Sequence, residues 1–377
     1  MKKLIGIIFI ATSMFILTAC AGTTTPPAAQ PPAPPAPPAP AAVTPAPTPA
    51  PASVVDEGPQ YVTVTYFDAA GDAHEVVVRQ NPTSVAVFDW SILDMLYTIG
   101  WENTGIETLV IPATATLPAE IAWFADQDFV IRGGTLHYVN WDVLDLVEPE
   151  LVILGMRSFA HNAAGETTTP EVRAELRAEA EEKYPDTAFI RLTQSSTRSN
   201  LLNDTEHNAS ILAQIFPNIA DDIEAYMAET RAAINEIQAK VQESESTALF
   251  VMVWADRMSI FLYGSRFHMI YDEFGFTPAA ESLPQWTDQH GLDARAEFIL
   301  SSDPDVILLL DRTDMASPTG GVGVQNFMAD SIIANTSAAQ NGNIFVLEGN
   351  AWYTVTGGFS ATQTKIANIM EFVSGLE

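Results

Sequence analysis

The sequence contains few of the residues that carry covalent or metal chemistry. Its 377 residues include one cysteine, Cys20, and six histidines. One cysteine excludes internal disulfides, cysteine-rich zinc sites and CxxC redox centres, and the histidines show no close metal-ligand spacing. The sequence also has no GxSxG, HExxH, P-loop or dinucleotide-binding motif. We therefore expect no enzyme activity, no catalytic residue, no metal ligand and no cofactor.

Basic residues are scarce as well. Lys and Arg together number 17 against 47 Asp and Glu, so the formal net charge is -30. Nucleic-acid binding needs a basic face that displaces counterions from phosphates, which argues against that class of partner. Because 47% of the residues are hydrophobic, the acidity does not indicate disorder. The length favours about two domains.

The N-terminus is typical of a bacterial lipoprotein signal peptide. Lys2 and Lys3 precede an apolar stretch from Leu4 to Leu17, which is shorter than the roughly 20 residues of a membrane-spanning helix. Small residues follow up to Cys20. We expect cleavage after residue 19 and a lipid on Cys20, which would anchor the chain to the extracytoplasmic face of the cell membrane. An ordinary secretory signal peptide is the alternative.

Residues 20–60 are predicted to form a linker. Thirteen of the 26 residues from 26 to 51 are proline. Proline fixes its backbone angle and lacks a hydrogen-bond donor, so the segment favours extended polyproline II rather than helix or sheet. At about 3.1 Å per residue it could span at most roughly 80 Å.

From residue 61 onwards, short apolar runs alternate with helical patterns. A β-hairpin is predicted over Tyr61–Val78, and strands over 84–88, 151–154 and 188–190. Strands that alternate with helices indicate an α/β lobe with a mostly parallel sheet, here 61–217.

A long amphipathic pattern follows this lobe. Apolar residues recur at intervals of three, four and seven from 218 to 243, without proline or glycine, which predicts one long helix. A second α/β lobe, 244–377, begins after it. The expected fold is α/β, with two pseudo-symmetric lobes joined by one long helix and a ligand cleft between them.

An internal sequence repeat supports two equivalent lobes. In each half, a carboxylate stands seven residues before a proline, and an apolar strand and an arginine follow. The two sets are Asp142, Pro149 and Arg157, and Glu297, Pro304 and Arg312. Ligands of open α/β sheets bind at the carboxyl ends of strands, so Arg157 and Arg312 should face the cleft. The carboxylates are expected toward the outer ends of the lobes, where a two-fold symmetric partner could bind them. The alternative explanation is that helix–proline–strand connections are common in α/β proteins and that the arginines form surface ion pairs.

Several further short segments follow one another in a set order and spacing from about Gln60 to the C-terminus. They are Val85–Asp89, Pro149–Ile153, Gly264–Phe267, Phe274–Ala279, His290–Gly291, Asp311–Arg312 and Trp352–Tyr353 before Gly357–Gly358. Together they resemble the iron-siderophore-binding lipoproteins of ABC importers, especially those for catecholate and mixed catecholate-citrate siderophores such as petrobactin. The resemblance implies a receptor that captures a ferric siderophore and delivers it to a permease dimer with a cytoplasmic ATPase. We expect a monomer whose lobes move little.

The resemblance also implies roles for particular residues. Three cleft arginines, Arg157, Arg266 and Arg312, would hold the anionic ferric complex, because a guanidinium is a rigid and permanently charged donor fork. Ser265 could add a hydrogen bond at the rim, and Trp90 and Tyr353 are the best-placed aromatic residues. Further aromatic candidates are Trp254, Trp352 and His290.

Asp142 and Glu297 match the acids that, in the family, dock onto arginines of the permease dimer. Helix-start capping would be the simpler role for both.

The chain could instead be a receptor of the same fold for haem, cobalamin or a metal ion. From another class, an extracellular hydrolase or a wall-associated interaction protein is less favoured.

Overall fold

The computed structural model describes residues 58–68, 71–192, 201–254, 257–280, 291–313, 315 and 321–375. These residues belong to one compact unit, Glu57–Glu377. Cys20, the predicted signal peptide and linker, and His290 lie outside the described residues. In the described ranges, no helix combines the length and the apolar character that a membrane span requires.

The first lobe is built on a five-stranded parallel sheet with the strand order β5-β4-β3-β6-β7. The strands are β3 (Ser84–Phe88), β4 (Thr108–Ile111), β5 (Val130–Arg132), β6 (Leu151–Leu154) and β7 (Ala188–Arg191). The predicted hairpin is confirmed as an antiparallel pair, β1 (Tyr61–Phe67) and β2 (Ala73–Arg79). The helices are α1 (Trp90–Gly100), α2 (Trp141–Val147), α3 (Pro170–Lys183) and α4 (Leu201–Ile215), with 3-10 turns η1 (Trp101–Asn103), η2 (Ala119–Asp126) and η3 (Pro217–Ile219).

The second lobe has a mixed sheet with the order β11-β9-β8-β12-β13, and β10 pairs with β8. β8, β12 and β13 are parallel, whereas β9 and β11 are antiparallel. The strands are β8 (Thr247–Trp254), β9 (Arg257–Phe261), β10 (Thr277–Pro278), β11 (Leu292–Ala294), β12 (Val306–Asp311) and β13 (Ile344–Leu347). The helices are α6 (Met269–Asp272), α7 (Ala296–Ser302), α8 (Val322–Ala329), α9 (Ser337–Gln340), α10 (Gly349–Tyr353) and α11 (Phe359–Ser374), with the turn η5 (Ile333–Asn335).

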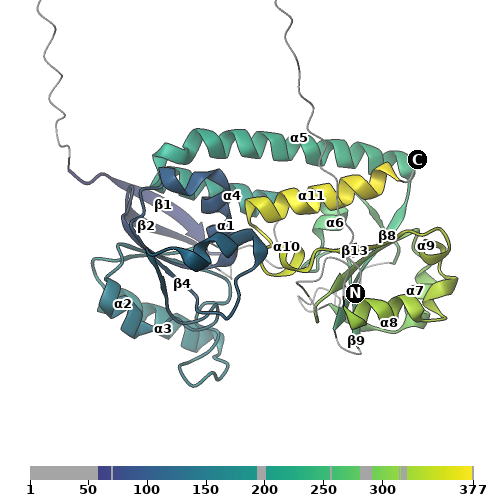
Figure 1. Ribbon diagram of the computed structural model, residues 1–377, viewed down its shortest axis with the longest axis horizontal. Coiled ribbons are helices and arrows are strands. Elements are labelled where there is room, and N and C mark those ends of the chain that lie inside the picture. The colour runs from purple at the N-terminus through teal and green to yellow at the C-terminus, as the bar shows by residue number, and fades with distance from the viewer. Residues whose placement is uncertain are drawn as a thin grey trace, which may run out of the picture. The chain divides into compact units, whose positions relative to one another are not determined.

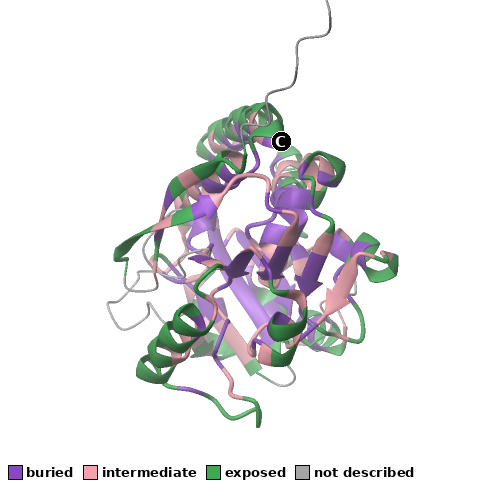
Figure 2. Cartoon of the chain, turned by 90° about the vertical axis from the view of Figure 1, so that its left-hand side faces the viewer, coloured by how far each residue is buried: buried purple, intermediate pink, exposed green. Residues whose placement is uncertain are grey.

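The central strands of the two lobe sheets, such as β6 and β12, are buried on both faces, as parallel strands covered by helices require. Along β3, Val85 and Val87 contribute to one apolar core and Ala86 and Phe88 to another. Side chains alternate between faces along a strand, so a continuous apolar run fills both cores. Figure 2 shows the buried residues at the centre of the molecule and the exposed residues mainly on the outer helices.

The predicted long helix is present as α5 (Ala220–Ser244), and it joins the lobes through its packing. Residues of its first half, such as Ile223, belong to the core of the first lobe, and residues of its second half, such as Ile237, to the core of the second. The two-lobed α/β fold is therefore confirmed. α11 lies beside α5 (Figure 1) and also reaches both cores, with Phe359 in the first and Phe372 in the second. Two helices cross between the lobes, one more than expected.

The two copies of the internal sequence repeat form equivalent helix–strand units. α2 and α7 each have seven residues and end at a residue with left-handed backbone, Glu148 (φ 46°) and Asp303 (φ 39°). A proline and a buried strand, β6 or β12, then follow. Arg157 and Arg312 consequently come after the carboxyl ends of equivalent strands, as predicted.

Candidate functional site

The three predicted arginines converge although they come from different parts of the chain. Arg157 lies in the turn after β6, Arg312 directly after β12, and Arg266 in the turn before α6. Burial and, to a lesser extent, the positive charges of Arg157 and Arg312 together lower the pKa of Arg266 to about 10. Because like charges influence each other this way only at short range, both lobes contribute cations to one region.

Aromatic rings hold two of these guanidinium groups in place. The Arg266 guanidinium lies 4.1 Å from the ring centroid of Tyr353 and donates a hydrogen bond to the Tyr353 carbonyl. Arg312 lies 4.0 Å from the ring centroid of Trp254 and 5.1 Å from that of Tyr353. Cation–π contacts orient a cation without neutralising its charge. Tyr353 therefore positions two of the three arginines.

None of the three arginines is paired with an acid in the described part of the chain. The ion pairs there join other cations to carboxylates, for example Arg257 to Asp293 at 2.6 Å. Lone arginines are unexpected in a chain with 47 acids, since a surface arginine would readily find a carboxylate. Three arginines without carboxylate partners make a site that can bind an anion.

Asp89 borders this cationic region from the first lobe. Its carboxylate caps α1 by accepting a hydrogen bond from the Ser91 backbone N–H at 2.8 Å. Burial raises the pKa of Asp89, and the positive charge of Arg157 opposes that rise. A Cβ atom at Gly155 would overlap the Asp89 carboxylate, so glycine lets the Arg157 turn approach α1 closely. The sequence signalled this residue only as part of the segment that ends β3.

Two sequence-predicted contact residues do not face the site. Ser265 is fully buried, and its hydroxyl donates to the Leu262 carbonyl at 2.5 Å, so it stabilises the turn that carries Arg266. Trp352 is also fully buried, and its indole N–H donates to the side chain of Asn368 at 3.0 Å. The expected rim hydrogen bond of Ser265 and the expected ligand contact of Trp352 were therefore wrong, because the sequence neighbours of a surface residue can point into the core.

Trp90 and Trp254 have different environments. Trp90 is half-buried and packs against the cores of both lobes, and its indole nitrogen has no hydrogen-bond partner among the described residues. Trp254 is 45% exposed at the end of β8, beneath Arg312. Trp90 therefore lies between the two lobes, and Trp254 lies at the carboxyl end of a strand.

Asp142 and Glu297 are exposed in the first turns of α2 and α7. Neither caps its helix, because Asn140 caps α2 and the α7 cap, Arg295, makes no side-chain hydrogen bond. Their expected location toward the outer ends of the lobes was wrong. A helix that leads into a strand runs back along it, so its first turn lies near the strand's carboxyl end.

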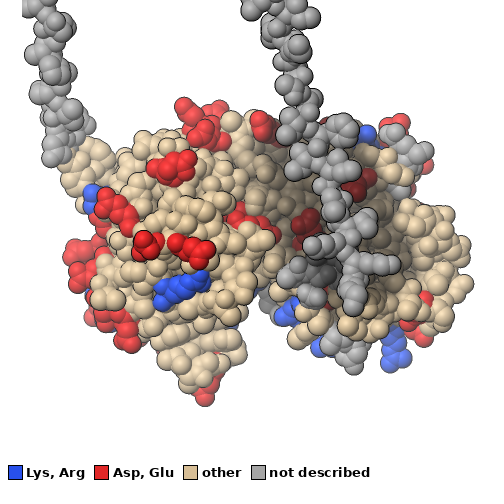
Figure 3. Space-filling view, in the orientation of Figure 1, with Lys and Arg blue, Asp and Glu red and all other residues tan. Residues whose placement is uncertain are grey.

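Backbone contacts fix this location in both lobes. Just before α2, the His137 carbonyl accepts a hydrogen bond from the backbone N–H of His161, which follows β6, at 2.9 Å, and the two imidazole rings stack. Just before α7, Ala294 lies opposite Met258 of β9. Met258 in turn lies opposite Val253 of β8, which is the register partner of Asp311. The two acids therefore lie at the same sheet edges as the arginines. Figure 3 shows acidic side chains spread over the surface and a notch between the lobes with basic side chains at its right-hand side.

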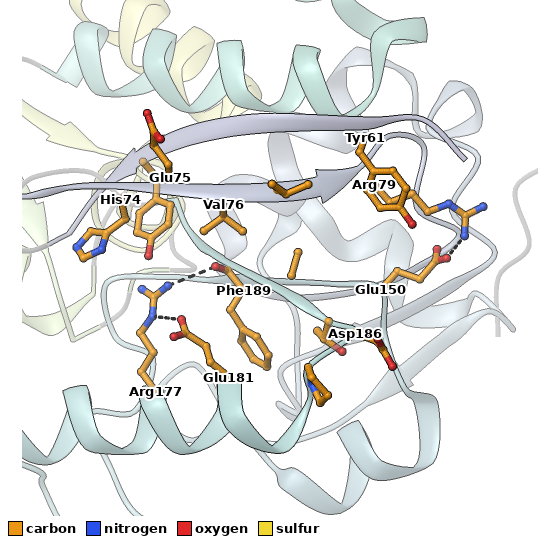
Figure 4. Close-up of a pocket in the computed structure, with 15 residues that line it drawn as sticks. Tyr61, His74, Glu75, Val76, Arg79, Glu150, Arg177, Glu181, Asp186 and Phe189 are labelled. Carbon is orange, nitrogen blue, oxygen red and sulfur yellow. Dashed lines mark hydrogen bonds and ion pairs between the residues drawn. The ribbon is translucent and has the colours of Figure 1, made fainter. Parts of the chain in front are cut away.

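A separate cavity of about 650 Å³ lies in the first lobe, between the β1–β2 hairpin and the α3–β7 segment (Figure 4). Its arginines are already paired: Arg79 with Glu150, and Arg177 with Glu181 at 2.8 Å. Arg177 also lies 5.0 Å from the ring centroid of Tyr66. Because its charges are neutralised internally, this cavity is a poorer anion site than the arginine cluster.

Within the described residues, no group of three or more His, Cys, Asp and Glu side chains is placed to hold a metal ion. His137 and His161 lie near Arg157, but burial lowers the pKa of His137, and Arg157 lowers it further. The lowered pKa favours the neutral form of His137, so burial and Arg157 both reduce the positive charge that this side chain adds to the arginine cluster.

Two α/β lobes are joined by long helices and carry arginines at their strand ends that have no acidic partner among the described residues. This combination defines a solute-binding protein. The chain belongs to the periplasmic binding protein family, whose profile matches residues 85–351. Members of this family bind solutes and are not enzymes.

Individual relatives agree with this assignment. The petrobactin-binding protein YclQ of Bacillus subtilis is 23% identical over 308 residues, which cover 81% of this chain and 86% of YclQ. The ferric-anguibactin-binding protein FatB of Vibrio anguillarum is 27% identical over 297 residues, which cover 79% of this chain and 84% of FatB. Among solved structures, the catecholate-siderophore-binding protein VctP of Vibrio cholerae has a TM-score of 0.67 at 22% identity, covering 82% of this chain and all of VctP. The family resemblance expected from the sequence is confirmed.

Proposed function

We propose that this chain is an extracytoplasmic binding lipoprotein that captures a ferric siderophore of the catecholate or mixed catecholate-citrate type. It delivers this ligand to an ABC importer. The observation that carries the proposal is the cluster of Arg157, Arg266 and Arg312, which lack carboxylate partners in the described ranges. Family membership and the siderophore-binding relatives YclQ and FatB support it.

The chemistry of such a ligand suits the cluster. A ferric complex of catecholate or citrate oxygens keeps a net negative charge, and each charge-assisted hydrogen bond from a guanidinium contributes about 1.5 to 3 kcal/mol. Catechol rings would pack on the exposed face of Trp254 and against Tyr353, with Trp90 as a further contact. The siderophore supplies the iron ligands, so the protein needs none.

Tryptophan fluorescence quenching would test the ligand class. The purified protein is titrated with ferric catecholate, ferric citrate and ferric hydroxamate siderophores, and the catecholate or mixed type should bind most tightly. Alanine at any one of the three arginines should weaken binding about tenfold to a hundredfold. Arg257→Ala is the matched control, because Arg257 is already paired with Asp293 on the surface. Unchanged affinity of the triple variant would contradict the proposal.

The position of Asp142 and Glu297 supports docking onto a permease dimer. Both acids are exposed, lie in equivalent helices and share the sheet edges that carry the arginines. A two-fold symmetric partner with basic residues would meet one acid from each lobe while the cleft faces it.

Charge reversal would test the docking. In a reconstituted transport assay, the double variant Asp142→Lys and Glu297→Lys should bind ligand normally and lose uptake. The control is Glu175→Lys with Glu229→Lys, which reverses the same number of charges at exposed positions of α3 and α5. Normal uptake by the first variant would contradict the docking role.

Attachment to the membrane rests on the sequence around Cys20. Membrane fractionation of cells that express the chain would test it. The wild-type chain should sediment with membranes, and Cys20→Ser should abolish this attachment. Membrane association that survives the substitution would exclude a lipid on Cys20.

A further inference from the structure

A carboxylate of the first lobe caps a helix that belongs mainly to the second. Asp94 lies in α1 and is fully buried. It accepts a hydrogen bond from the Ser360 hydroxyl and another from the Ala361 backbone N–H at 3.2 Å, both in the first turn of α11. A negative charge there stabilises the unpaired N–H groups of a helix start.

The chain around the start of α11 is shaped for this contact. The residue that precedes α11 is Gly358, which has no side chain with which to cap the helix. A Cβ atom at Gly358 would overlap the Asp94 carboxylate, so glycine is needed there for the close approach. One turn before Asp94, the Ser91 hydroxyl accepts a hydrogen bond from the Gly357 N–H at 3.3 Å. We call Asp94 together with Ser360 and Ala361 the interlobe cap.

Residues of α5 and of α11 itself fix the same segment. The Tyr226 hydroxyl of α5 donates to the Phe359 carbonyl at 2.6 Å, and the buried Lys365 amino group of α11 donates to the Thr356 carbonyl. Residues 356–361 are thus held from three directions, and the contacts from α1 of the first lobe are those of Ser91 with Gly357 and of Asp94 with Ser360 and Ala361.

The elements joined by the interlobe cap also carry the two halves of the arginine site. α1 begins at Trp90, immediately after Asp89, which the charge of Arg157 influences. On the other side, Tyr353 precedes α11 by a few residues, and its ring and carbonyl contact Arg266. A shift between α1 and α11 would therefore change the separation of Arg157 from the other two arginines.

We propose that Asp94 is a positioning residue that sets the spacing of the ligand-binding groups of the two lobes without touching the ligand. The inference rests on the proposed function for its affinity readout, but not for its structural readout. A receptor whose lobes are held in the binding arrangement loses no affinity to other arrangements, whereas a freely varying one binds in proportion to its competent fraction.

The first measurement needs no ligand. Spin labels are placed on cysteines introduced at Glu175 in α3 and Met328 in α8, both exposed, in the full chain with Cys20→Ser. Double electron–electron resonance then reports the interlobe distance. The wild type should give one narrow distribution, and Asp94→Ala and Gly358→Ala should broaden it. Ser360→Ala, a milder change that preserves folding, should broaden it less.

Thr98→Val is the matched control. The Thr98 hydroxyl donates to Asp94 at 3.3 Å from within α1, so this change removes a hydrogen bond to the same carboxylate inside one lobe. It should leave the distribution narrow. In the second measurement, Asp94→Ala should bind ferric catecholate siderophore about tenfold more weakly, as expected if a tenth of the molecules hold the competent arrangement.

The outcomes separate the two proposals. Narrow, unchanged distributions in Asp94→Ala, Gly358→Ala and Ser360→Ala would overturn the positioning role, and so would broadening in Thr98→Val equal to that in Ser360→Ala. If the wild type binds no ferric siderophore at all, the proposed function fails while the distance measurements still decide the role of Asp94.

Discussion

Replacing Arg266 by methionine should make the ligand-free protein more stable and weaken its ligand binding. The Arg266 guanidinium is half-buried beside two like charges, and its pKa falls from the ordinary 12.5 to about 10. Each pKa unit corresponds to about 1.36 kcal/mol, so keeping this group charged costs about 3 kcal/mol relative to water. Removing the cation leaves the Tyr353 carbonyl without its donor, which costs about 1 kcal/mol or more. The net gain should be about 1 to 2 kcal/mol.

Urea unfolding at neutral pH, with and without ferric siderophore, measures both effects. Arg266→Met should raise the free energy of unfolding of the ligand-free protein and lose most of the stabilisation that ligand gives to the wild type. Arg257→Met is the control of opposite sign. Its ion pair with Asp293 is exposed, and such a pair stabilises by about 0 to 1 kcal/mol, so this variant should be equally or slightly less stable than the wild type.

The combination of results is what tests the reasoning. A structural arginine would lose stability when replaced and leave binding intact. If Arg266→Met is less stable than the wild type and still responds fully to ligand, Arg266 is not a strained cation held for an anion.

Three further predictions concern pH and stacking. Burial lowers the pKa of Lys365 to about 7 from 10.5, so the folded state is uncharged there while the unfolded chain still binds a proton. The free energy of unfolding should therefore rise with pH between about 7 and 10.5, by at most about 1.4 kcal/mol per pH unit, and Lys365→Met should remove this slope in pH-dependent urea unfolding. Burial raises the pKa of Glu273 to about 7 from 4.5, so stability should fall as pH rises between these values, and Glu273→Gln should abolish the fall. A Lys365→Met variant that keeps the full slope, or a Glu273→Gln variant that keeps the full fall, would contradict these assignments. Trp254→Ala should weaken siderophore binding severalfold by releasing Arg312, with little change in stability because the ring is 45% exposed; a large loss of stability would show a core role instead.

The sequence predicted the fold well because the fold rests on local patterns. The buried run of β6, the unbroken apolar period of α5 and the helix–proline–strand repeat are all readable from neighbouring residues. Arg157 and Arg312 could be predicted for the same reason, since a strand end is a position in the chain. The second crossing helix was missed, because nothing in the pattern of α11 shows that Phe359 enters the core of the other lobe.

The errors concern side-chain direction and distant partners. Ser265 was expected at the rim beside Arg266, and Trp352 was expected to contact the ligand, but both side chains point into the core instead. The edge that carries Asp142 differs from the expected one because α2 runs back along β6, which places its first turn near the carboxyl end of that strand. The interlobe cap was invisible, since Asp94 and Ser360 are 266 residues apart and a buried aspartate in a helix has no sequence signature.

A protein with a net charge of -30 would be expected to repel the anionic ligand that we propose. This expectation holds only if remote charges act on the ligand as strongly as those in the binding site. At physiological ionic strength, exposed charges are screened over about 8 Å, so most surface acids contribute little to the potential at the site. Arg157, Arg266 and Arg312 act at contact distance, and burial at Arg266 strengthens that action because less water screens it. Affinity is then set by the local cations, whereas the surface acids govern solubility and the approach of other charged molecules. The scarcity of basic residues thus limits the number of possible anion sites, and it gives weight to three neighbouring arginines that have no carboxylate partner in the described ranges.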